Sequence, residues 1–333
     1  MNDKIDFVIL WVDGSDENWQ KEFEKYKESS GDRREVRFRD WDNLQYLFRA
    51  FEKFTPWVNK IHFVTWGHLP KWLNINHPKL NIIKHEMFMD KSDLPVFNAN
   101  PLEIYIHNIK DLSDNFVYFN DDFFPTAPIS KERFFKDGLP CDSLISNAIS
   151  SSAGVGHFVL NNLEVINRHF SKKESIKNHY KKWLTPIYRK DLFRNLVLLP
   201  WARFTGFVDP HMPQPFLKST FEEVWEMEEK VLKKTLSSRF RECSNVNQYL
   251  FRYWQLAQGK FYPISMKDTQ YITMTMKNIK NGEISNLITS QKYKMICLND
   301  SDSIESEAAF EEAKITVQNA FEKILPNKSS FEI

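Results

Sequence analysis

Two adjacent acids, Asp121 and Asp122, are the side chains best placed to do chemistry in this chain. They follow residues 116–120, a short apolar and aromatic run with the length and composition of a buried strand. Acids at the point where a strand leaves an open α/β sheet lie at its carboxyl edge, where such sheets bind ligands. Their oxygens could hold a hard divalent cation, Mg²⁺ or Mn²⁺, that carries the phosphates of a nucleotide. A turn in which Asn120 and the acids cap neighbouring amides is the alternative.

A second strand-like run, residues 295–298, also ends in an acid. Asn299 and Asp300 follow it and so repeat the pattern of a strand that stops at Asn-Asp. Asp300 is therefore predicted to complete the cation site begun by Asp121 and Asp122.

Several basic residues have the character of phosphate ligands. Arg37 and Arg39 alternate with apolar residues and would project from one face of an extended segment. Guanidinium groups bind phosphate oxygens in a bidentate manner, so the pair could clamp a pyrophosphate or an acceptor. A solvated edge strand is the alternative at equal weight. Arg241 is a further candidate phosphate ligand, and His211, held in a proline-rich stretch, is suited to proton transfer or phosphate binding.

The elements that must position these side chains are those of an α/β protein. Residues 5–12 read as a strand, 13–16 as a polar turn and 19–26 as a helix, an order that builds nucleotide pockets in α/β sheets. Asp13 in the turn could bond a ribose or a base edge, whereas helix capping by the turn residues is the alternative. Asp6 lies inside the strand, where a buried acid serves either the site or an internal hydrogen bond.

The rest of the chain alternates strand and helix patterns, which is typical of a mostly parallel sheet. Strands are predicted at 61–66 and 80–85, a core helix at 44–54, and a helix at 102–109 that follows a loop containing Asn98. Loops so placed often carry substrate contacts. A further helix is predicted to run from Arg239 to Trp254, and a last one from 310 to 324.

Length and composition exclude several classes of protein. The 333 residues are 42% hydrophobic and 27% charged, which fits one elaborated globular enzyme domain. A net charge of +1 gives no support for a nucleic-acid partner. Three separated cysteines argue against a disulfide framework and favour a reducing cytoplasm. Without a signal-peptide pattern or a long apolar span, we expect a protein that is cytoplasmic or peripheral on the inner face of the cytoplasmic membrane.

One segment has a charge of its own. Lysines and arginines crowd a helical pattern between 161 and 203, with Trp183 and Tyr188 among them. Such a segment can lie on an anionic membrane surface or hold a polyanionic acceptor, and a solvated helical insertion is the alternative.

In four ordered blocks the chain resembles the Stealth family, bacterial capsular polysaccharide phosphotransferases that share their core with the GlcNAc-1-phosphotransferase of lysosomal enzymes. The resemblance spans nearly the whole chain, and the four blocks together are specific although each alone is weak. Gln45 replaces an arginine that the family usually carries, whereas Arg49 keeps the second basic position. The blocks contain residues 6–16, then 37–58 with 94–98 and 118–122, then 209–213 with 239–241, and finally 296–300.

The resemblance implies a fold, a reaction and a division of the chain. The fold is a Rossmann-like, glycosyltransferase-A-like α/β core flanked by helices. The reaction is transfer of a sugar-1-phosphate from a nucleotide-diphospho-sugar to a hydroxyl of an oligosaccharide or polysaccharide acceptor, free or lipid-linked. The expected divisions are a nucleotide-sugar-binding core at 1–150, a basic helical insertion at 151–203, and the remainder of the catalytic domain at 204–333.

The resemblance also implies roles for residues. Asp121, Asp122 and Asp300 would hold the metal ion, while Arg39 and Arg241 would act with Asp121 in catalysis and His211 would take the acceptor proton. The predicted substrate-binding residues are Asp6, Trp11, Asp13, Gly14, Asp40, Arg49 and Asn98.

Two other functions stay open at this point. A metal-dependent glycosyltransferase would attack the anomeric carbon and release a nucleoside diphosphate, whereas sugar-phosphate transfer releases a monophosphate. A non-catalytic carbohydrate-binding module would use the aromatic residues as stacking platforms. Clustered acids and arginines speak against the module, because sugar stacking requires neither.

Overall fold

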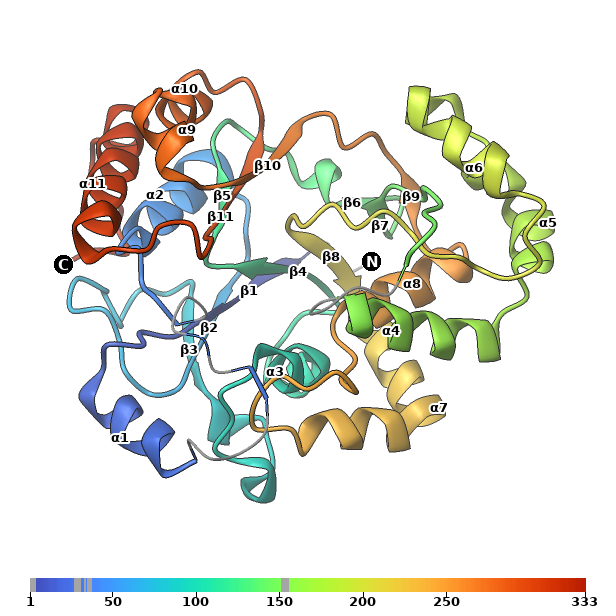
Figure 1. The fold of residues 1–333 in the computed structure, drawn as a ribbon, viewed down its shortest axis with the longest axis horizontal. Helices are drawn as coiled ribbons and strands as arrows, with labels where there is room; N and C mark the ends of the chain where they lie inside the picture. The colour runs from blue at the N-terminus through green and yellow to red at the C-terminus, as the bar shows by residue number, and fades with distance from the viewer. Residues whose placement is uncertain (1–3, 27–30, 33, 35–37, 151–155) are drawn as a thin grey trace.

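A computed structural model describes residues 4–26, 31–32, 34, 38–150 and 156–333, and it has a mixed five-stranded sheet at its centre (Figure 1). The strand order is β3-β2-β1-β4-β8; the first four are mutually parallel and β8 runs antiparallel at the edge. This confirms the prediction of a Rossmann-like, mostly parallel α/β sheet. The strands are β1 (Ile5–Trp11), β2 (Ile61–Thr65), β3 (Leu80–Lys84), β4 (Asn115–Asn120) and β8 (Gln214–Leu217).

Helices cover both faces of this sheet, so its central strands are apolar on both sides. Along β1, Phe7 and Ile9 pack into one core and Val8 into the other, as the alternation of side chains in a strand requires. The first core is closed by α2 (Leu44–Phe54), α9 (Met276–Lys280), α10 (Glu283–Thr289) and α11 (Glu307–Ile324). The second is closed by α3 (Ala99–Tyr105), α4 (Gly156–His169), α7 (Lys218–Leu236) and α8 (Tyr249–Ala257).

A smaller sheet joins the central one just beyond the acid pair. It has the order β10-β11-β5, and its last strand begins immediately after Asp122. The amide of Leu298 donates to the carbonyl of Asp122 (3.0 Å), so the end of β11 lies beside the acids. The strands of this sheet are β5 (Phe123–Pro125), β10 (Thr269–Thr273) and β11 (Met295–Asn299); a third sheet contains β6 (Phe135–Lys136), β7 (Leu139–Asp142) and β9 (Tyr262–Pro263).

The predicted helices are present, but one is shorter than predicted and the basic segment is divided into several helices. The helix expected from Arg239 begins only at Tyr249, because residues 239–248 form a turn that is cross-linked by side chains. The basic segment forms α4, α5 (Lys172–Trp183), the 3₁₀ helix η6 (Pro186–Asp191) and α6 (Leu192–Leu198). The remaining α-helix is α1 (Glu17–Lys25), and the described residues also contain the short 3₁₀ helices η2 (His85–Met87), η3 (Lys91–Asp93), η4 (Ile106–Asn108) and η5 (Lys131–Arg133). The proposed division at 150 and 203 stays a prediction. None of the helices among the described residues combines the length and apolar character that crossing a bilayer requires.

Asp6 corrects one prediction, because it does not face the ligand edge of the sheet. It is fully buried in β1, where its carboxylate accepts hydrogen bonds from Asn59 Nδ2 (2.7 Å), from the Ser113 amide (2.8 Å) and from the Lys60 amide (3.1 Å). Burial alone would raise its pKa, but hydrogen bonds, the one to His62 first among them, outweigh burial and keep the pKa below its usual value. Asp6 therefore has the internal role that was its alternative.

Arg49, predicted to bind substrate, is also internal. Its side chain is 9% exposed and forms a bidentate pair with Glu332, at 2.9 Å for both nitrogen–oxygen contacts. It also donates to Glu322 (3.1 Å) and to the Leu325 carbonyl (2.9 Å). The arginine thus fastens the end of the chain onto α2 and does not line the ligand cleft.

Replacing Arg49 with Met should lower the free energy of unfolding by about 3–5 kcal/mol, since it leaves the Glu332 carboxylate, 2% exposed, without its cation. Urea denaturation followed by circular dichroism would measure the loss. The double variant R49M/E332Q removes both charges and should recover part of the stability. An R49M protein as stable as the wild type would contradict the structural role.

Candidate functional site

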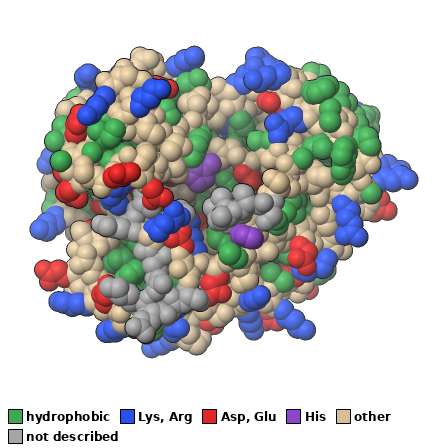
Figure 2. Space-filling view, viewed as in Figure 1, with side chains coloured by type: hydrophobic (Ala, Val, Ile, Leu, Met, Phe, Trp, Pro, Cys, Tyr) green, Lys and Arg blue, Asp and Glu red, His purple; other side chains and the backbone are tan. Residues whose placement is uncertain are grey.

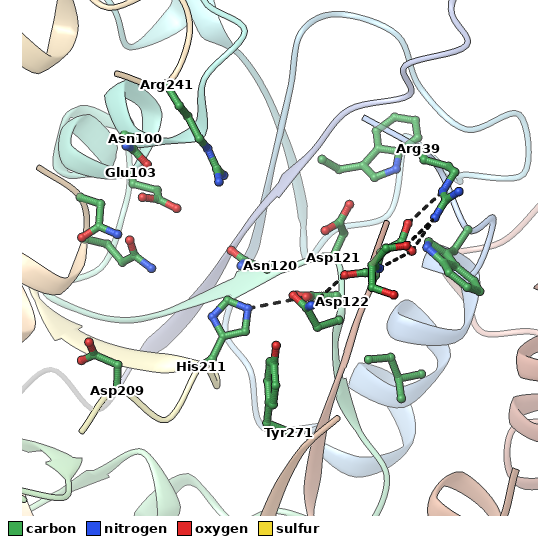
Figure 3. A pocket seen from close by; sticks show the side chains of 18 of the residues that line it. Arg39, Asn100, Glu103, Asn120, Asp121, Asp122, Asp209, His211, Arg241 and Tyr271 are labelled. Atoms are coloured by element: carbon green, nitrogen blue, oxygen red, sulfur yellow. Dashed lines mark hydrogen bonds and ion pairs between the residues drawn. The ribbon is translucent and has the colours of Figure 1, made fainter. Parts of the chain in front are cut away.

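A cleft of about 790 Å³ opens at the carboxyl edge of the central sheet (Figure 3). It lies where the strand order reverses, between Trp11 at the end of β1 and Asn120 at the end of the neighbouring β4. Crevices at this point of an open α/β sheet are the usual ligand sites, and this volume is in the range of small-molecule pockets. The hollow near the centre of Figure 2 is on the same face. Other segments that line it are residues 39–44, 100–103, 209–211, 247–249 and 298–302.

Asp121 and Asp122 form the acidic part of this cleft, as predicted. The chain turns at these two residues, so both reach the same cavity. The position of Asp121 deep in the cleft raises its pKa to about 8, and the neighbouring charges of Asp122 and Asp40 add to this. The Asp121 residue is nevertheless exposed to solvent, which moderates these effects. A bound cation would relieve the repulsion and displace the proton.

Asp122 belongs to a group that could hold a metal ion. Among the described residues, one ligand atom each from Asp122, His211 and Cys297 lie within 4.8 Å of one another. The His211 Nε2 to Asp122 Oδ2 distance is 3.8 Å, and the Cys297 thiol donates to the same oxygen at 3.4 Å. The other oxygen of Asp122, Oδ1, is buried and has no partner among the residues described. Such an atom fits a ligand that completes the site.

The chemistry of these three donors favours an oxygen-ligated ion. Burial raises the pKa of the Cys297 thiol far above its ordinary value, and a soft sulfur is in any case a poorer ligand than a carboxylate for a hard cation. Hard cations such as Mg²⁺ prefer carboxylate oxygens. The acid pair is therefore the better candidate for holding a hard cation.

His211 is held in an unusual position. Its backbone has a φ of 46°, in the left-handed region that few non-glycine residues adopt and that is frequent at functional sites. The imidazole packs edge-on against Phe123 (5.1 Å between centroids) and Tyr271 (5.6 Å). The ring is thereby fixed in the cleft beside Asp122 (Figure 3).

The loop that carries His211 is anchored by an ion-pair network that sequence reasoning missed. Arg252, 2% exposed, binds Asp142 with two nitrogens and Asp209 with a third (2.9 Å). Tyr253 donates to the other oxygen of Asp209 (2.5 Å). Burial raises the pKa of Asp209 to about 6 in spite of these partners. Asp209 lines the cleft, but both of its oxygens are engaged, so it acts as a support for His211.

Asp300 lines the cleft as predicted but is not in the metal-ligating group. Arg39 donates to both of its carboxylate oxygens, at 2.9 and 2.6 Å, and to the carbonyl of Ile304 (3.1 Å). The geometry thus joins two predicted site residues to each other. The metal role of Asp300 and the phosphate-binding role of Arg39 lose support, because their groups are already paired. Arg37 lies outside the described residues.

Arg241 lines the cleft, and Asn98 holds the loop on which it lies. The amide of Asn98 is buried and donates to the carbonyls of Ser238 (3.3 Å) and Phe240 (3.1 Å) and to Asn245 Oδ1 (2.9 Å). Asn98 therefore borders a small adjoining pocket, and it positions Arg241 through hydrogen bonds to the backbone of the loop. Sequence reasoning identified both residues but assigned Asn98 to direct substrate contact.

The predicted residues near the end of β1 divide into two groups. Trp11 and Asp40 line the cleft, and burial, with the charges of Asp13 and Asp42, raises the pKa of Asp40 to about 6. Asp13 and Gly14 lie outside the lining residues. The carboxylate of Asp13 accepts from the Ser15 amide and hydroxyl (2.8 and 2.6 Å), and a Cβ at Gly14 would lie 2.4 Å from the Phe38 carbonyl oxygen. Both shape the turn.

Neutral polar groups line the opposite end of the cleft, and sequence reasoning missed most of them. Asn100 Nδ2 and Gln248 Oε1 are buried without a partner among the described residues. Glu103 is 5% exposed and accepts from the Tyr118 hydroxyl (3.0 Å); burial raises its pKa, while Arg241 and Tyr118 act against the rise. Buried donors and acceptors without partners indicate a hydrogen-bonding ligand.

The fold and the cleft define an α/β protein with an acidic ligand site at the switch point of a Rossmann-like sheet. The chain belongs to the Stealth family. The family descriptions that match are Stealth protein CR1, conserved region 1 (residues 3–31), CR2, conserved region 2 (37–141), and CR4, conserved region 4 (286–333).

Several curated relatives match along the whole chain. Capsular polysaccharide phosphotransferase WcwK of Streptococcus pneumoniae is 42% identical over 99% of this chain and 98% of its own length. Receptor polysaccharide phosphotransferase WefC of Streptococcus gordonii is 39% identical over 100% of both. Exopolysaccharide phosphotransferase cps2G of Lactiplantibacillus plantarum is 38% identical over 98% and 96%.

Solved structures with a remote likeness include two glycosyltransferases. The galactosyltransferase LgtC, in complex with donor and acceptor sugar analogs, has a TM-score of 0.40 at 9% identity, over 94% of this chain and 95% of that one. The glycosyltransferase GlyE of Streptococcus pneumoniae has a TM-score of 0.37 at 10% identity, over 98% of this chain; the chain spans 66% of the GlyE chain.

Replacing Asp122 with Asn should weaken Mn²⁺ binding at least about tenfold, because it removes one of the two charges that attract the ion. His211→Gln should leave the affinity within about threefold if carboxylate oxygens are the ligands. Isothermal titration calorimetry with Mn²⁺ and no substrate would compare the two. A large loss of affinity in H211Q would instead make the imidazole a metal ligand.

Proposed function

We propose that this protein transfers a hexose-1-phosphate or N-acetylhexosamine-1-phosphate from a nucleotide-diphospho-sugar to a hydroxyl of a glycan acceptor. The product is a phosphodiester linkage in a bacterial capsular or cell-surface polysaccharide. Membership of the Stealth family supports this, as do the names of full-length relatives, which are capsular, receptor and exopolysaccharide phosphotransferases.

The observation that carries the proposal is the crowding of carboxylates at the end of β4. Asp121, Asp122 and Asp40 share one cleft, and their mutual repulsion contributes to the raised pKa of Asp121. Such a site attracts a divalent cation, and a cation of this kind neutralises a diphosphate. A module that only stacks sugars on aromatic rings has no use for this arrangement.

Mg²⁺ or Mn²⁺ is the proposed cofactor, with Asp121 and Asp122 as the residues that would hold it. Two observations fit an ion at this point: one oxygen of Asp122 has no partner among the described residues, and the pKa of Asp121 is raised. When bound, the ion would supply charge neutralisation for the diphosphate.

In the proposed reaction an acceptor hydroxyl attacks the phosphorus that bears the sugar. The new phosphorus–oxygen bond forms as the bond to the nucleoside phosphate breaks, and a nucleoside monophosphate leaves. His211 takes the acceptor proton, for which its fixed ring beside the acid pair is suited. Arg241, on the same cleft, stabilises the negative charge on the phosphoryl oxygens. The bond at the anomeric carbon stays intact.

The neutral polar end of the cleft is the proposed place for the sugar hydroxyls. Asn100 offers a donor and Gln248 an acceptor, and both atoms are buried and unpartnered among the described residues. Glu103 adds a further buried carboxyl oxygen, Oε2, that has no partner among the described residues. A hydroxyl-rich ring satisfies donors and acceptors together, whereas a phosphate would satisfy only donors.

The acceptor that we propose is an oligosaccharide or polysaccharide carried on a lipid, which would place the enzyme at the inner face of the cytoplasmic membrane. The names of the relatives support a glycan acceptor. The lipid and the membrane contact are proposals in addition to this.

Incubation with nucleotide sugars, Mg²⁺ and a soluble glycan acceptor should release a nucleoside monophosphate and give a phosphodiester signal in phosphorus NMR. Asp122→Ala should lower kcat by at least about 100-fold, because charge on the diphosphate is no longer neutralised. Glu226→Ala, at an exposed acid on α7, is the matched control and should match the wild type. Release of a nucleoside diphosphate would show ordinary glycosyl transfer and overturn the proposal.

Gln248→Leu should raise the KM for the sugar donor about tenfold and change kcat by less than about threefold, since one hydrogen bond of binding energy is lost. Gln258→Leu is the control, because Gln258 also has a buried unpartnered oxygen but lies outside the cleft. Steady-state kinetics with a soluble acceptor would measure both. Equal KM values for the two variants would mean that Gln248 does not contact the donor.

A further inference from the structure

Exposed apolar side chains gather on one part of the molecule. Seven of the thirteen large hydrophobic side chains that are exposed in the described residues lie between positions 180 and 201. In Figure 2 they fall within the green area at the upper right, over the region of α5 and α6 in Figure 1. The seven are Tyr180, Leu184, Ile187, Phe193, Leu196, Val197 and Trp201, and we call them the apolar face.

Helix α6 shows most clearly that this exposure is built into the fold. Phe193, Leu196 and Val197 have the spacing of one helix face, and they are 69%, 47% and 47% exposed. The opposite side of the same helix contains the buried Asn195 and Leu198. The helix therefore buries one amide together with Leu198 and exposes three apolar side chains on the face where a normal surface helix carries polar ones.

The inward side of the segment is firmly attached, so the outward side is a fixed surface. Asn195 donates to the carbonyls of Leu144 (2.9 Å) and Trp183 (2.8 Å) and accepts from the Ser146 amide (2.6 Å). Lys172, nearly buried, donates to the carbonyls of Leu198 (2.5 Å) and Trp201 (3.0 Å). These bonds hold the middle and the C-terminal end of α6, and the apolar face stays exposed among the residues that the structure describes.

The charge around the apolar face has one sign. Residues 172–203 contain nine basic residues and only two acidic ones. Seven of the basic side chains are exposed, and none of these seven forms an ion pair within the described residues. They are Lys173, Lys177, Lys181, Arg189, Lys190, Arg194 and Arg203.

We infer that the apolar face is a docking surface for an anionic phospholipid bilayer, in which α6 lies in the plane of the membrane interface. Phe, Trp and Leu side chains that project together with flanking lysines and arginines are the composition of interfacial helices. Each basic residue adds attraction to an anionic leaflet, and the apolar side chains add burial among the acyl chains. A second copy of this chain would bring like-charged surfaces together, which disfavours a dimer through this face.

This inference deepens the proposed function, because it names the surface that would bring a lipid-linked acceptor to the enzyme. Only the biological reason for membrane binding rests on the proposed function. The surface itself is argued from exposure, attachment and charge, so membrane binding and phosphate transfer can be tested apart.

The test is binding of the full chain to vesicles in the absence of substrates. Wild-type protein should sediment with phosphatidylcholine vesicles that contain phosphatidylglycerol, bind vesicles of phosphatidylcholine alone far more weakly, and lose binding as salt is raised. The variant F193S/L196S should bind at least about tenfold more weakly to the anionic vesicles, because two inserted side chains are lost. Trp201 should show a blue shift of its emission on binding, which a Trp201→Phe variant would remove.

The control variant Ile315→Ser removes an equally exposed apolar residue from α11, distant in the chain, and should bind like the wild type. Circular dichroism of each variant checks folding, and turnover with a soluble acceptor should be the same in wild type and F193S/L196S. Unchanged vesicle binding by F193S/L196S would overturn the inference, and so would a wild-type dimer that this variant converts to monomer. Vesicle binding as expected without any phosphate transfer would instead leave the inference standing and refute the proposed function.

Discussion

The rest of the site depends on the concentration of negative charge where β4 leaves the sheet. Asp121 and Asp122 are held side by side because the chain turns there and passes directly into β5 of the second sheet. The Asp122 carbonyl is bonded to β11, so neither acid can move away without breaking the contact between the sheets. The packing that joins two sheets is thus also what forces the carboxylates together.

This arrangement has a cost for the metal-free protein. The pKa of Asp121 is raised above its value in an unfolded chain, so the folded state binds the proton more tightly, and stability falls as the pH rises from about 4 towards 8. A bound cation reverses the sign of the effect, since it favours the ionised carboxylates. The proposed role of the acids in binding a cation would thus come at the expense of intrinsic stability, a common property of functional sites.

Much of this could be predicted from the sequence because the pattern was local. A strand of a parallel sheet that ends in acids places them at the carboxyl edge of the sheet, and the run before Asp121 has the length and composition of such a strand. Arg49, Asp6 and Asp300 show where such reasoning ends. Each is a charged residue in an apolar context, and whether its partner is a substrate or another side chain depends on residues that lie far away in the sequence. Arg49 pairs with Glu332, 283 positions away, and no spacing rule could have indicated that pair.

Asn100 and Gln248 show the converse case, in which residues of the cleft were not predicted from the sequence. An amide carries no sign of function in a sequence, and only the fold shows that these two are buried beside a cleft with atoms left unpaired. Asn100 lies in α3 and Gln248 directly precedes α8, and both of these helices contribute residues to the second core.

In the segment from 172 to 203 the sequence showed the basic residues but not the exposed apolar face. Its basic residues were visible in the sequence and left membrane contact, acceptor binding and a solvated helix as equal alternatives. The spacing of Phe193, Leu196 and Val197 is that of a core-facing stripe, and by periodicity alone they would be assigned to the interior. The fold instead buries Asn195 and Leu198, and the three hydrogen bonds of Asn195 fix the rotation of α6. A solvated helix does not require apolar side chains to face outward, and a glycan-binding helix would turn its polar side outward. A helix at a membrane interface does require an outward apolar face, as α6 has.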